Sequence, residues 1–419
     1  LVGHWTFPGS PQVTVRVLYT PEYENNAKPA LDATIESLEF FSRTLGAYPY
    51  RTVTVVIPPH NAAEAGGMEY PTFFTASSFD AVPAGTMTRD LLDFVTIHEF
   101  GHGYFYGILG SNEFEEPMLD EGLNEYWDQR MLRAAKRDMH LGTTGMKKLG
   151  IDLRLPVFAY ERLGAMNENP ADPLGQNSWN RMSGGSYGTV YSRTATTMRD
   201  LEAAVGTPAL ERAFKLYYQR WKFRHPSVAD LREALIEGTG QRETVERFFD
   251  HQVYAVNPVD DSIASFASNE VLPQPGYTMY KGQRVELTSK AIDKAVSNKR
   301  EAWKKANPKA KQGMGAFPYR TVVLVRRKGA DMPQTLVVKF ADGSTETAHF
   351  SGNQPWQRFT WTRQAKAVSV ELDPKGMHYL DASKLDDSRT LKGDASVARR
   401  VGGQFGSAIQ TFFSFLVGL

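Results

Sequence analysis

The sequence His98-Glu99-Phe100-Gly101-His102, followed after eighteen residues by Glu121, constrains the fold of this chain more than any other feature. An α-helix has about 3.6 residues per turn, so histidines four residues apart lie on one face and can bind one metal ion. Glu99 lies about 100° around the helix from His98, where its carboxylate can accept a proton from a water beside the metal. The spacing therefore predicts a helix that carries two zinc ligands and a general base.

Two helices are expected to assemble this site. The stretch from Thr88 to Leu109 has apolar residues at helical spacing and no proline, which predicts a buried helix. Pro117 is typical of the first turn of a second helix, expected to continue to Met131. Two antiparallel helices joined by a short loop would return the downstream carboxylate to the histidines, with a fourth metal position open, as in catalytic zinc sites. The predicted zinc ligands are His98, His102 and Glu121.

An isolated match to this motif can also be a solvated helix face or a pair of satisfied core histidines. The downstream glutamate favours the metal site, because it supplies the third ligand at a plausible distance along the chain. The other histidines of the chain show no ligand spacing. We therefore expect one Zn²⁺ per chain and no second metal centre.

These motifs resemble the zinc signature of the aminopeptidase N and leukotriene hydrolase family of gluzincin metallopeptidases. Upstream, Gly66-Gly67-Met68-Glu69-Tyr70-Pro71 is similar to the GxMEN exopeptidase motif of that family. Downstream, Tyr191-Ser192-Arg193-Thr194 occupies the place of the YxKG segment, whose tyrosine stabilises the oxyanion of the reaction. The resemblance covers about Pro11 to Asn257 and implies a thermolysin-like zinc peptidase unit.

The chain also departs from the family pattern around the substrate cleft. The GxMEN asparagine is Tyr70, the usual asparagine before the second glutamate is Asp120, and the YxKG lysine and glycine are Arg193 and Thr194. None of these changes removes a catalytic group. We therefore expect them to affect the fine specificity more than the chemistry.

The resemblance implies roles for two further side chains, and each role has a chemical rationale. A carboxylate at Glu69 can pair with a protonated substrate amine, and glycines before it let the backbone approach a ligand closely. The phenolic O–H of Tyr191 can donate to a tetrahedral intermediate. The alternatives are an ordinary strand-edge glutamate and a half-buried helix tyrosine, with Tyr187 as the competing oxyanion donor. The expected substrate-binding residues are Gly66, Gly67, Met68 and Glu69, and the expected catalytic residues are Glu99 and Tyr191.

The expected activity is a zinc-dependent aminopeptidase that hydrolyses the first bond of peptides with a free N-terminus. Glu99 would act as general base, and Glu69 would hold the amino terminus so that the first peptide bond lies over the metal. Three alternatives stay open: a zinc endopeptidase, an epoxide hydrolase on the same site, and a catalytically silent peptide-binding scaffold.

Composition limits the partners and says little about the compartment. The 419 residues include 48 basic and 47 acidic side chains, which gives no overall bias toward nucleic acid. The absence of cysteine excludes disulfides, thiolate zinc ligands and a cysteine nucleophile. We expect a cell-envelope or periplasmic location in preference to the cytoplasm.

The expected fold class is multidomain α+β. A thermolysin-like catalytic domain passes into helices and is followed by a small all-β, sandwich-like domain. The expected division is 1–19 as the end of an N-terminal β domain that precedes this chain, 20–257 as the peptidase domain, 258–319 as a linker and basic insertion, 320–385 as the β domain, and 386–419 as a tail.

Two segments outside the catalytic unit have ambiguous patterns. Lysines are frequent from Lys290 to Lys311, where we expect a solvated helix or mobile insertion in preference to an anion-binding patch. Residues Val401 to Leu419 lack charged side chains and have apolar residues on one helical face. We expect an amphipathic packing helix there, with peripheral membrane contact as the alternative.

Overall fold

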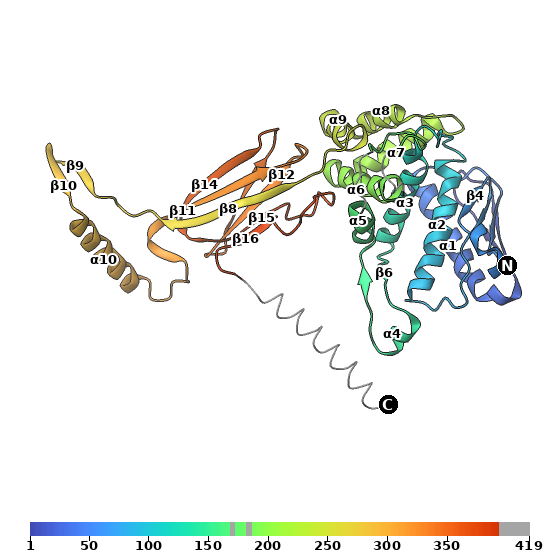
Figure 1. Ribbon diagram of the computed structural model, residues 1–419, viewed down its shortest axis with the longest axis horizontal. Helices are drawn as coiled ribbons and strands as arrows, with labels where there is room; N and C mark the ends of the chain where they lie inside the picture. Colours follow the sequence, from blue (N-terminus) through green and yellow to red (C-terminus); the bar gives the residue numbers. More distant parts are fainter. Residues whose placement is uncertain (168–171, 182–186, 394–419) are drawn as a thin grey trace. The chain divides into compact units, whose positions relative to one another are not determined.

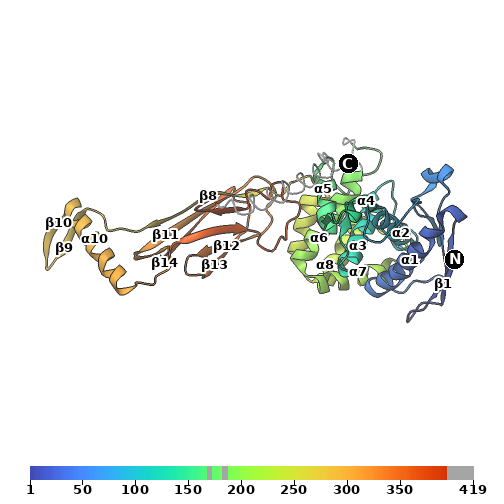
Figure 2. The ribbon, with the colours of Figure 1, turned by 90° about the horizontal axis from the view of Figure 1, so that it is seen from below.

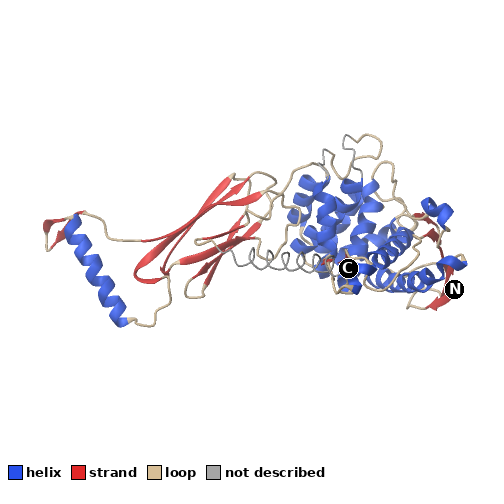
Figure 3. Cartoon of the chain, turned by 60° about the horizontal axis from the view of Figure 1, so that its bottom comes forward, coloured by secondary structure: helices blue, strands red, loops and turns tan. Residues whose placement is uncertain are grey.

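The computed structural model describes residues 1–167, 172–181 and 187–393 (Figure 1). It divides into two compact units. Unit 1 comprises Leu1–Pro258 together with Met377–Ala382, and unit 2 comprises Val259–Gly376 and Ser383–Leu419. Helices predominate in unit 1 and strands in unit 2 (Figure 3). The expectation of a mixed α+β chain with several sheets is therefore confirmed.

Unit 1 opens with a sheet whose strand order is β1-β2-β3-β5-β4. Its central strands β2, β3 and β5 run parallel, whereas β1 and β4 pair antiparallel at the two edges. Alternate residues of β2 are fully buried, which is the pattern of a strand with one face on a core. The strand bounds are β1 Val2–Trp5, β2 Val13–Leu18, β3 Thr52–Val56, β4 Met68–Tyr70 and β5 Phe73–Thr75.

Three helices connect this sheet to the motif residues: α1 (Glu24–Thr44), α2 (Met87–Phe105) and α3 (Glu121–Ala134). Helix α1 packs against α2 through an aromatic cluster, in which the Phe41 ring lies 5.6 Å from Phe100 and 5.4 Å from Tyr104. Aromatic pairs at such centroid distances contribute beyond their buried area. The buried zinc-motif helix predicted from the sequence is confirmed, and the second helix begins only at Glu121, after a short 3₁₀ turn η3 (Pro117–Leu119).

The rest of unit 1 is helical. A capping box between Ser227 and Asp230 starts α8, as its sequence pattern favours. Tyr187–Arg193 forms η4, a π-helix, which continues directly into α6. The helix bounds are α5 Val157–Asn167, α6 Thr194–Val205, α7 Thr207–Trp221, α8 Val228–Thr239, α9 Arg242–Phe248 and the π-helix η5 Phe249–Val253. Shorter elements are η1 Pro21–Tyr23, η2 His60–Ala65, α4 Thr144–Lys148, β6 Met139–His140 and β7 Arg154–Leu155.

A segment from far along the chain, Met377–Ala382, completes unit 1. The buried carboxylate of Asp200 on α6 accepts hydrogen bonds from the backbone N–H groups of Tyr379 (2.9 Å) and Leu380 (3.1 Å). Arg162 on α5 donates to the carbonyls of Tyr379 (2.7 Å) and Asp381 (2.8 Å). Since buried charges need hydrogen-bond partners, this short segment satisfies groups that α6 and α5 cannot satisfy alone.

The core of unit 2 is built from two sheets, with strand orders β14-β11-β8 and β13-β12-β15-β16. Both contribute to one buried apolar core, with Val323 and Val325 from β11 and Leu336 and Val338 from β12 among its members. Asp342-Gly343 lies in the turn of the hairpin between β12 and β13, where Gly343 has a φ of 93°, a conformation that glycine adopts readily. The bounds are β8 Asp261–Glu270, β11 Met314–Arg327, β12 Gln334–Phe340, β13 Thr345–Phe350, β14 Trp356–Ala365, β15 Ala367–Leu372 and β16 Ser388–Thr390.

The expectation of a linker from residue 258 onward is wrong for β8. The polar composition of this segment gives no local sign of a strand, because β8 pairs antiparallel with β11, at residues 49 to 66 positions further along the chain. Buried Asp261 forms an ion pair with Arg327 of β11 at 2.7 Å, and Ser268 hydrogen bonds with Thr321 at 2.9 Å. These polar residues are therefore buried as cross-strand pairs, which a local pattern does not reveal. Strand β16 likewise lies in the expected tail.

The lysine-rich segment forms α10 (Ser289–Ala306), so the expectation of a solvated helix is confirmed. Only Val296 of this helix is buried. With the exposed hairpin of β9 (Gly276–Tyr280) and β10 (Gln283–Leu287), it lies beyond the ends of β8 and β11 (Figures 1 and 2). The predicted C-terminal helix from Val401 to Leu419 falls outside the described residues. Within the described chain, no helix has both the length and the apolar character of a membrane span.

Candidate active site

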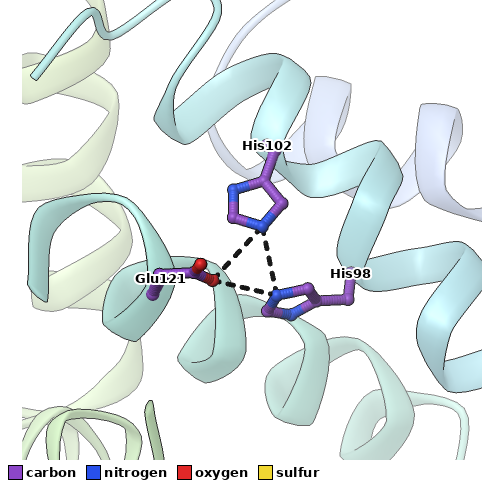
Figure 4. A group of neighbouring side chains, drawn as sticks. All are labelled: His98, His102 and Glu121. Carbon is purple, nitrogen blue, oxygen red and sulfur yellow. Dashed lines mark hydrogen bonds and ion pairs between the residues drawn. The ribbon is translucent and has the colours of Figure 1, made fainter. Parts of the chain in front are cut away.

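The predicted metal ligands converge on one point (Figure 4). Helix α2 presents His98 and His102, and their Nε2 atoms lie 3.1 Å apart. Glu121, at the start of α3, places its Oε2 atom 3.2 Å from His98 Nε2 and 3.3 Å from His102 Nε2. The three ligand atoms thus form a nearly equilateral triangle.

The size of this triangle fits a zinc ion. Ligand atoms at about 2.0 to 2.1 Å from zinc, arranged at tetrahedral angles, are about 3.3 to 3.4 Å apart. The observed edges of 3.1 to 3.3 Å are close to this value. Two imidazoles and one carboxylate also form a donor set of catalytic zinc sites, which leave a further position open.

Each histidine has a carboxylate behind it. His98 Nδ1 lies 2.8 Å from Asp128 Oδ2 and 3.3 Å from Glu125 Oε2, and His102 Nδ1 lies 2.6 Å from Asp120 Oδ1. A carboxylate that accepts the Nδ1 proton fixes the tautomer and leaves Nε2 free for a metal. From the sequence, Asp120 was recognised only as a departure from the family pattern, and Glu125 and Asp128 were not predicted. Their spacing from Glu121 along α3, at four and seven residues, was the available signal.

Close packing holds α3 against its neighbours. A Cβ on Gly122 would lie 2.5 Å from Thr194 on α6 and from the carbonyl oxygen of Val190 on η4, so no other residue fits there unless the helices separate. On the α2 side, the side-chain amide of Asn124 donates to the carbonyl of His98 at 2.7 Å. These contacts fix the position of Glu121 relative to both histidines.

Glu99 points into the site from α2. It is only 6% exposed, and its Oε2 atom has no hydrogen-bond partner among the described residues. Burial raises the pKa of its carboxyl to about 7, although His98 and His102 act in the opposite direction. A carboxyl with a pKa near neutrality is suited to accept and return a proton.

The acidic surroundings perturb the ligands as well. Burial lowers the pKa of both histidines, but their carboxylate partners outweigh it and raise the pKa of His102 to about 10 and that of His98 well above its usual value. Burial alone would raise the pKa of Glu121, but the hydrogen bonds and charges of His102 and His98 outweigh burial, and the pKa is lowered. Burial raises the pKa of Asp120 to about 7 and that of Asp128 to about 6. The cluster of carboxylates therefore favours bound positive charge, as a divalent cation would supply.

Edge strand β4 places Glu69 beside this centre. One oxygen of Glu69 belongs to a group with Glu99 and His102, whose ligand atoms all lie within 4.8 Å of one another. The turn before β4 needs Gly67, whose φ is 73° and whose Cβ position would lie 3.7 Å from Glu99 Oε1. The predicted motif thus lies next to the predicted general base.

Tyr191 lies on the π-helix η4, with its ring centroid 6.0 Å from that of His98. Its neighbour Arg193 is buried, donates to Gln252 Oε1 at 3.1 Å, and has its pKa lowered to about 10 by burial. Arg193 therefore contributes to packing, away from the zinc triangle. The side chain of Tyr187, the competing tyrosine, lies outside the described residues.

The mixed α+β fold and the convergent His, His, Glu triad are those of the metallopeptidase class. A sequence model of the peptidase family M1 domain matches residues 29–252, more than half of the chain. The chain therefore belongs to peptidase family M1, a family of zinc metallopeptidases, and the resemblance read from the motifs is confirmed.

Individual relatives are distant. Aminopeptidase 2 of Candida albicans is 24% identical over 236 residues, which cover 55% of this chain and 24% of the relative. Aminopeptidase N of Caulobacter vibrioides is 26% identical over 231 residues, which cover 54% of this chain and 25% of the relative. The chain thus spans about a quarter of the length of the curated relatives it matches.

A solved structure shares the fold. The crystal structure of Legionella pneumophila aminopeptidase A in complex with aspartic acid matches with a TM-score of 0.54 at 12% sequence identity. The match covers 89% of this chain and 36% of the other chain.

Proposed function

We propose that this protein is a zinc-dependent aminopeptidase. The observation that carries the proposal is the proximity of Glu69 to Glu99 and His102, with ligand atoms within 4.8 Å of one another. A carboxylate this close to the metal ligands is suitably placed to hold the terminal ammonium group of a substrate whose first peptide bond lies over the metal. The family and the names of the matched relatives support the same activity.

Three groups of residues would bind the metal, transfer the proton and stabilise the oxyanion. His98, His102 and Glu121 would hold a zinc ion, which supplies Lewis acidity and lowers the pKa of a water when bound. Glu99 would accept a proton from the attacking water and pass it to the leaving amine. Tyr191 would donate its O–H to the developing oxyanion.

Substrate binding would rest on the β4 edge. Gly66, Gly67 and Met68 lead into Glu69 at a strand that pairs on one side only, with β5. The carboxylate of Glu69 would bind the free N-terminal ammonium, which fixes the position of the first peptide bond relative to Glu99. The substrates would therefore be peptides with a free N-terminus.

Paired substrates and a matched variant test this proposal. Purified protein should contain about one zinc per chain and cleave free-amine peptides, whereas N-acetylated peptides of the same sequence should be cleaved at least about 100-fold more slowly. Glu99→Gln should keep its zinc and lose about 10² to 10⁴ in kcat, because the general base is removed while the ligands remain. Metal analysis measures the zinc content of the parent and the variant, and initial rates measure their cleavage of the two kinds of peptide.

Other outcomes favour the alternatives. Equal rates on free and acetylated peptides would contradict amine anchoring and indicate an endopeptidase. Hydrolysis of epoxides in place of peptides would indicate the epoxide hydrolase, and a zinc-free protein that binds peptides without cleaving them would indicate a scaffold.

A further inference from the structure

Glu113 brings a third carboxylate to the substrate side of the site, from the loop between α2 and α3. One oxygen each of Glu69, Glu113 and Asp120 form a group whose members all lie within 4.8 Å of one another. These residues come from β4, the loop and the N-cap of α3. The group adjoins the zinc triangle, because Asp120 Oδ1 accepts from His102 Nδ1 at 2.6 Å.

Two of the three carboxylates, Glu69 and Glu113, have no cationic partner among the described residues, and the third, Asp120, pairs only with His102. Among the described residues, no lysine or arginine lies within ion-pair distance of Glu69 or Glu113. Asp120 is fully buried, and its Oδ2 atom has no hydrogen-bond partner in the described chain. Buried carboxylate oxygens without partners are costly, so this arrangement favours a cationic ligand.

A primary ammonium group fits the arrangement. It has three N–H donors, one for each carboxylate. Acceptors about 2.8 Å from one tetrahedral nitrogen lie about 4.6 Å apart, which is compatible with three oxygens within 4.8 Å of one another. In an N-terminal residue, the amine nitrogen lies only about 3 Å from the carbonyl oxygen of the same residue. A peptide whose first carbonyl lies at the zinc triangle would therefore place its ammonium beside these carboxylates.

The loop is held in place before any ligand binds. Gly110 of this loop donates its N–H to the carbonyl of Arg224 at 2.9 Å, and the carboxylate of Glu116 accepts from the N–H of Val228 at 3.1 Å. Between them, Asn112 accepts the N–H of Phe114 on its side chain at 3.1 Å. Such preorganisation lowers the cost of ordering an anchor when substrate binds.

We infer that Glu113 is a second anchor for the substrate's N-terminal ammonium, which it shares with Glu69 and Asp120. Selectivity for a free N-terminus is then built partly into the loop between the two zinc-binding helices. This inference rests on the proposed aminopeptidase function and adds a specificity-determining residue to it.

The test is Glu113→Gln, with Glu115→Gln as the matched control. Glu115 lies in the same loop, is exposed, and is not part of the carboxylate group. On a panel of aminoacyl p-nitroanilides, Glu113→Gln should raise KM about tenfold and leave kcat within about twofold, since one charge-assisted hydrogen bond is weakened. Glu113→Asp should give an intermediate KM, and zinc content should match the parent protein. The control variant Glu115→Gln should have the KM and kcat of the parent protein.

Three results would overturn the inference. The first is an unchanged KM in Glu113→Gln in a parent protein that does prefer free amines; a parent without that preference would instead overturn the proposed function. The second is an equal rise in KM for Glu115→Gln, which would assign the effect to loop structure. The third is two zinc ions per chain with one lost in Glu113→Gln, which would make the group a second metal site.

Discussion

Each histidine of the predicted zinc triad pairs with a carboxylate through Nδ1, the ring nitrogen that does not face the other two predicted ligands. Asp120 stands where the related enzymes usually have asparagine, and it lies 2.6 Å from His102 Nδ1. A carboxylate increases the basicity of the imidazole more than an amide does, so we expect this departure to make His102 a stronger metal ligand. The metal affinity of this chain should therefore depend on the charge at residue 120.

We expect Asp120→Asn to weaken zinc binding by about 10-fold and Asp120→Ala by up to about 100-fold, because asparagine keeps a hydrogen-bond acceptor and alanine does not. Competition with a chelator of known affinity measures both constants. Asp138→Asn, on the exposed surface, is the control. Identical zinc affinities for all of these variants would show that the contact has no influence on the metal.

Glu161 provides a test by pH. It is 1% exposed and accepts from Gln129 Nε2 at 2.8 Å. Burial, followed by the charge of Glu125, raises the pKa of its carboxyl well above the usual value of 4.5. The folded protein therefore keeps a proton that the unfolded chain loses above about pH 4.5, and the free energy of unfolding falls as pH rises by up to about 1.4 kcal/mol per pH unit.

Glu161→Gln should remove this slope and make the protein more stable relative to the parent at pH 8 than at pH 5. Urea unfolding across this range measures the difference. Glu243→Gln, an exposed carboxyl, should leave the slope unchanged. Parallel pH profiles for Glu161→Gln and the parent would contradict a protonated Glu161.

At the scale of elements, the contact between α3 and the π-helix η4 determines where Glu121 lies. Gly122→Ala should destabilise the protein by about 1 to 3 kcal/mol, because its Cβ would lie 2.5 Å from Thr194 and Val190. Zinc affinity should fall as well, since Glu121 moves with α3. Gly103→Ala on α2 is the control; its Cβ meets nothing within 4 Å and should stabilise the helix by up to about 1 kcal/mol. Equal stability of the two variants would exclude this packing constraint.

The helices and strands differ in how well they could be predicted from the sequence. Helices α2 and α3 and the ligands on them follow from periodicity, because their contacts repeat every three or four residues. Glu125 and Asp128, the carboxylates beside His98 Nδ1, lie at the same helical spacing from Glu121 and could have been predicted in the same way. Strand β8 could not be predicted from a local pattern, because its polar residues are buried through pairing with β11, which lies far along the chain. Glu113 was equally hidden, because an irregular loop brings it to Glu69 without any periodic signal.

At the scale of the whole molecule, unit 1 depends on residues that lie beyond most of unit 2 in the sequence. A fragment of residues 1–258 lacks Met377–Ala382 and leaves Asp200 without its two backbone donors. We expect this fragment to be less stable than unit 1 of the full chain by more than about 2 kcal/mol, measured by urea unfolding. Removing only residues 276–311 from the full chain should leave the stability of unit 1 unchanged. A fragment as stable as the full chain would show that the segment is dispensable.

The late return of Met377–Ala382 also sets an order of events during synthesis. Pro258 and Ala382 are 124 residues apart in the chain. At about 5 to 20 residues per second, translation needs about 6 to 25 s to cover this distance. Helices α2 and α3 of a nascent unit 1 are therefore synthesised long before α5 and α6 receive their last partners, and in that interval we expect α5 and α6 to be accessible to chaperones and proteases.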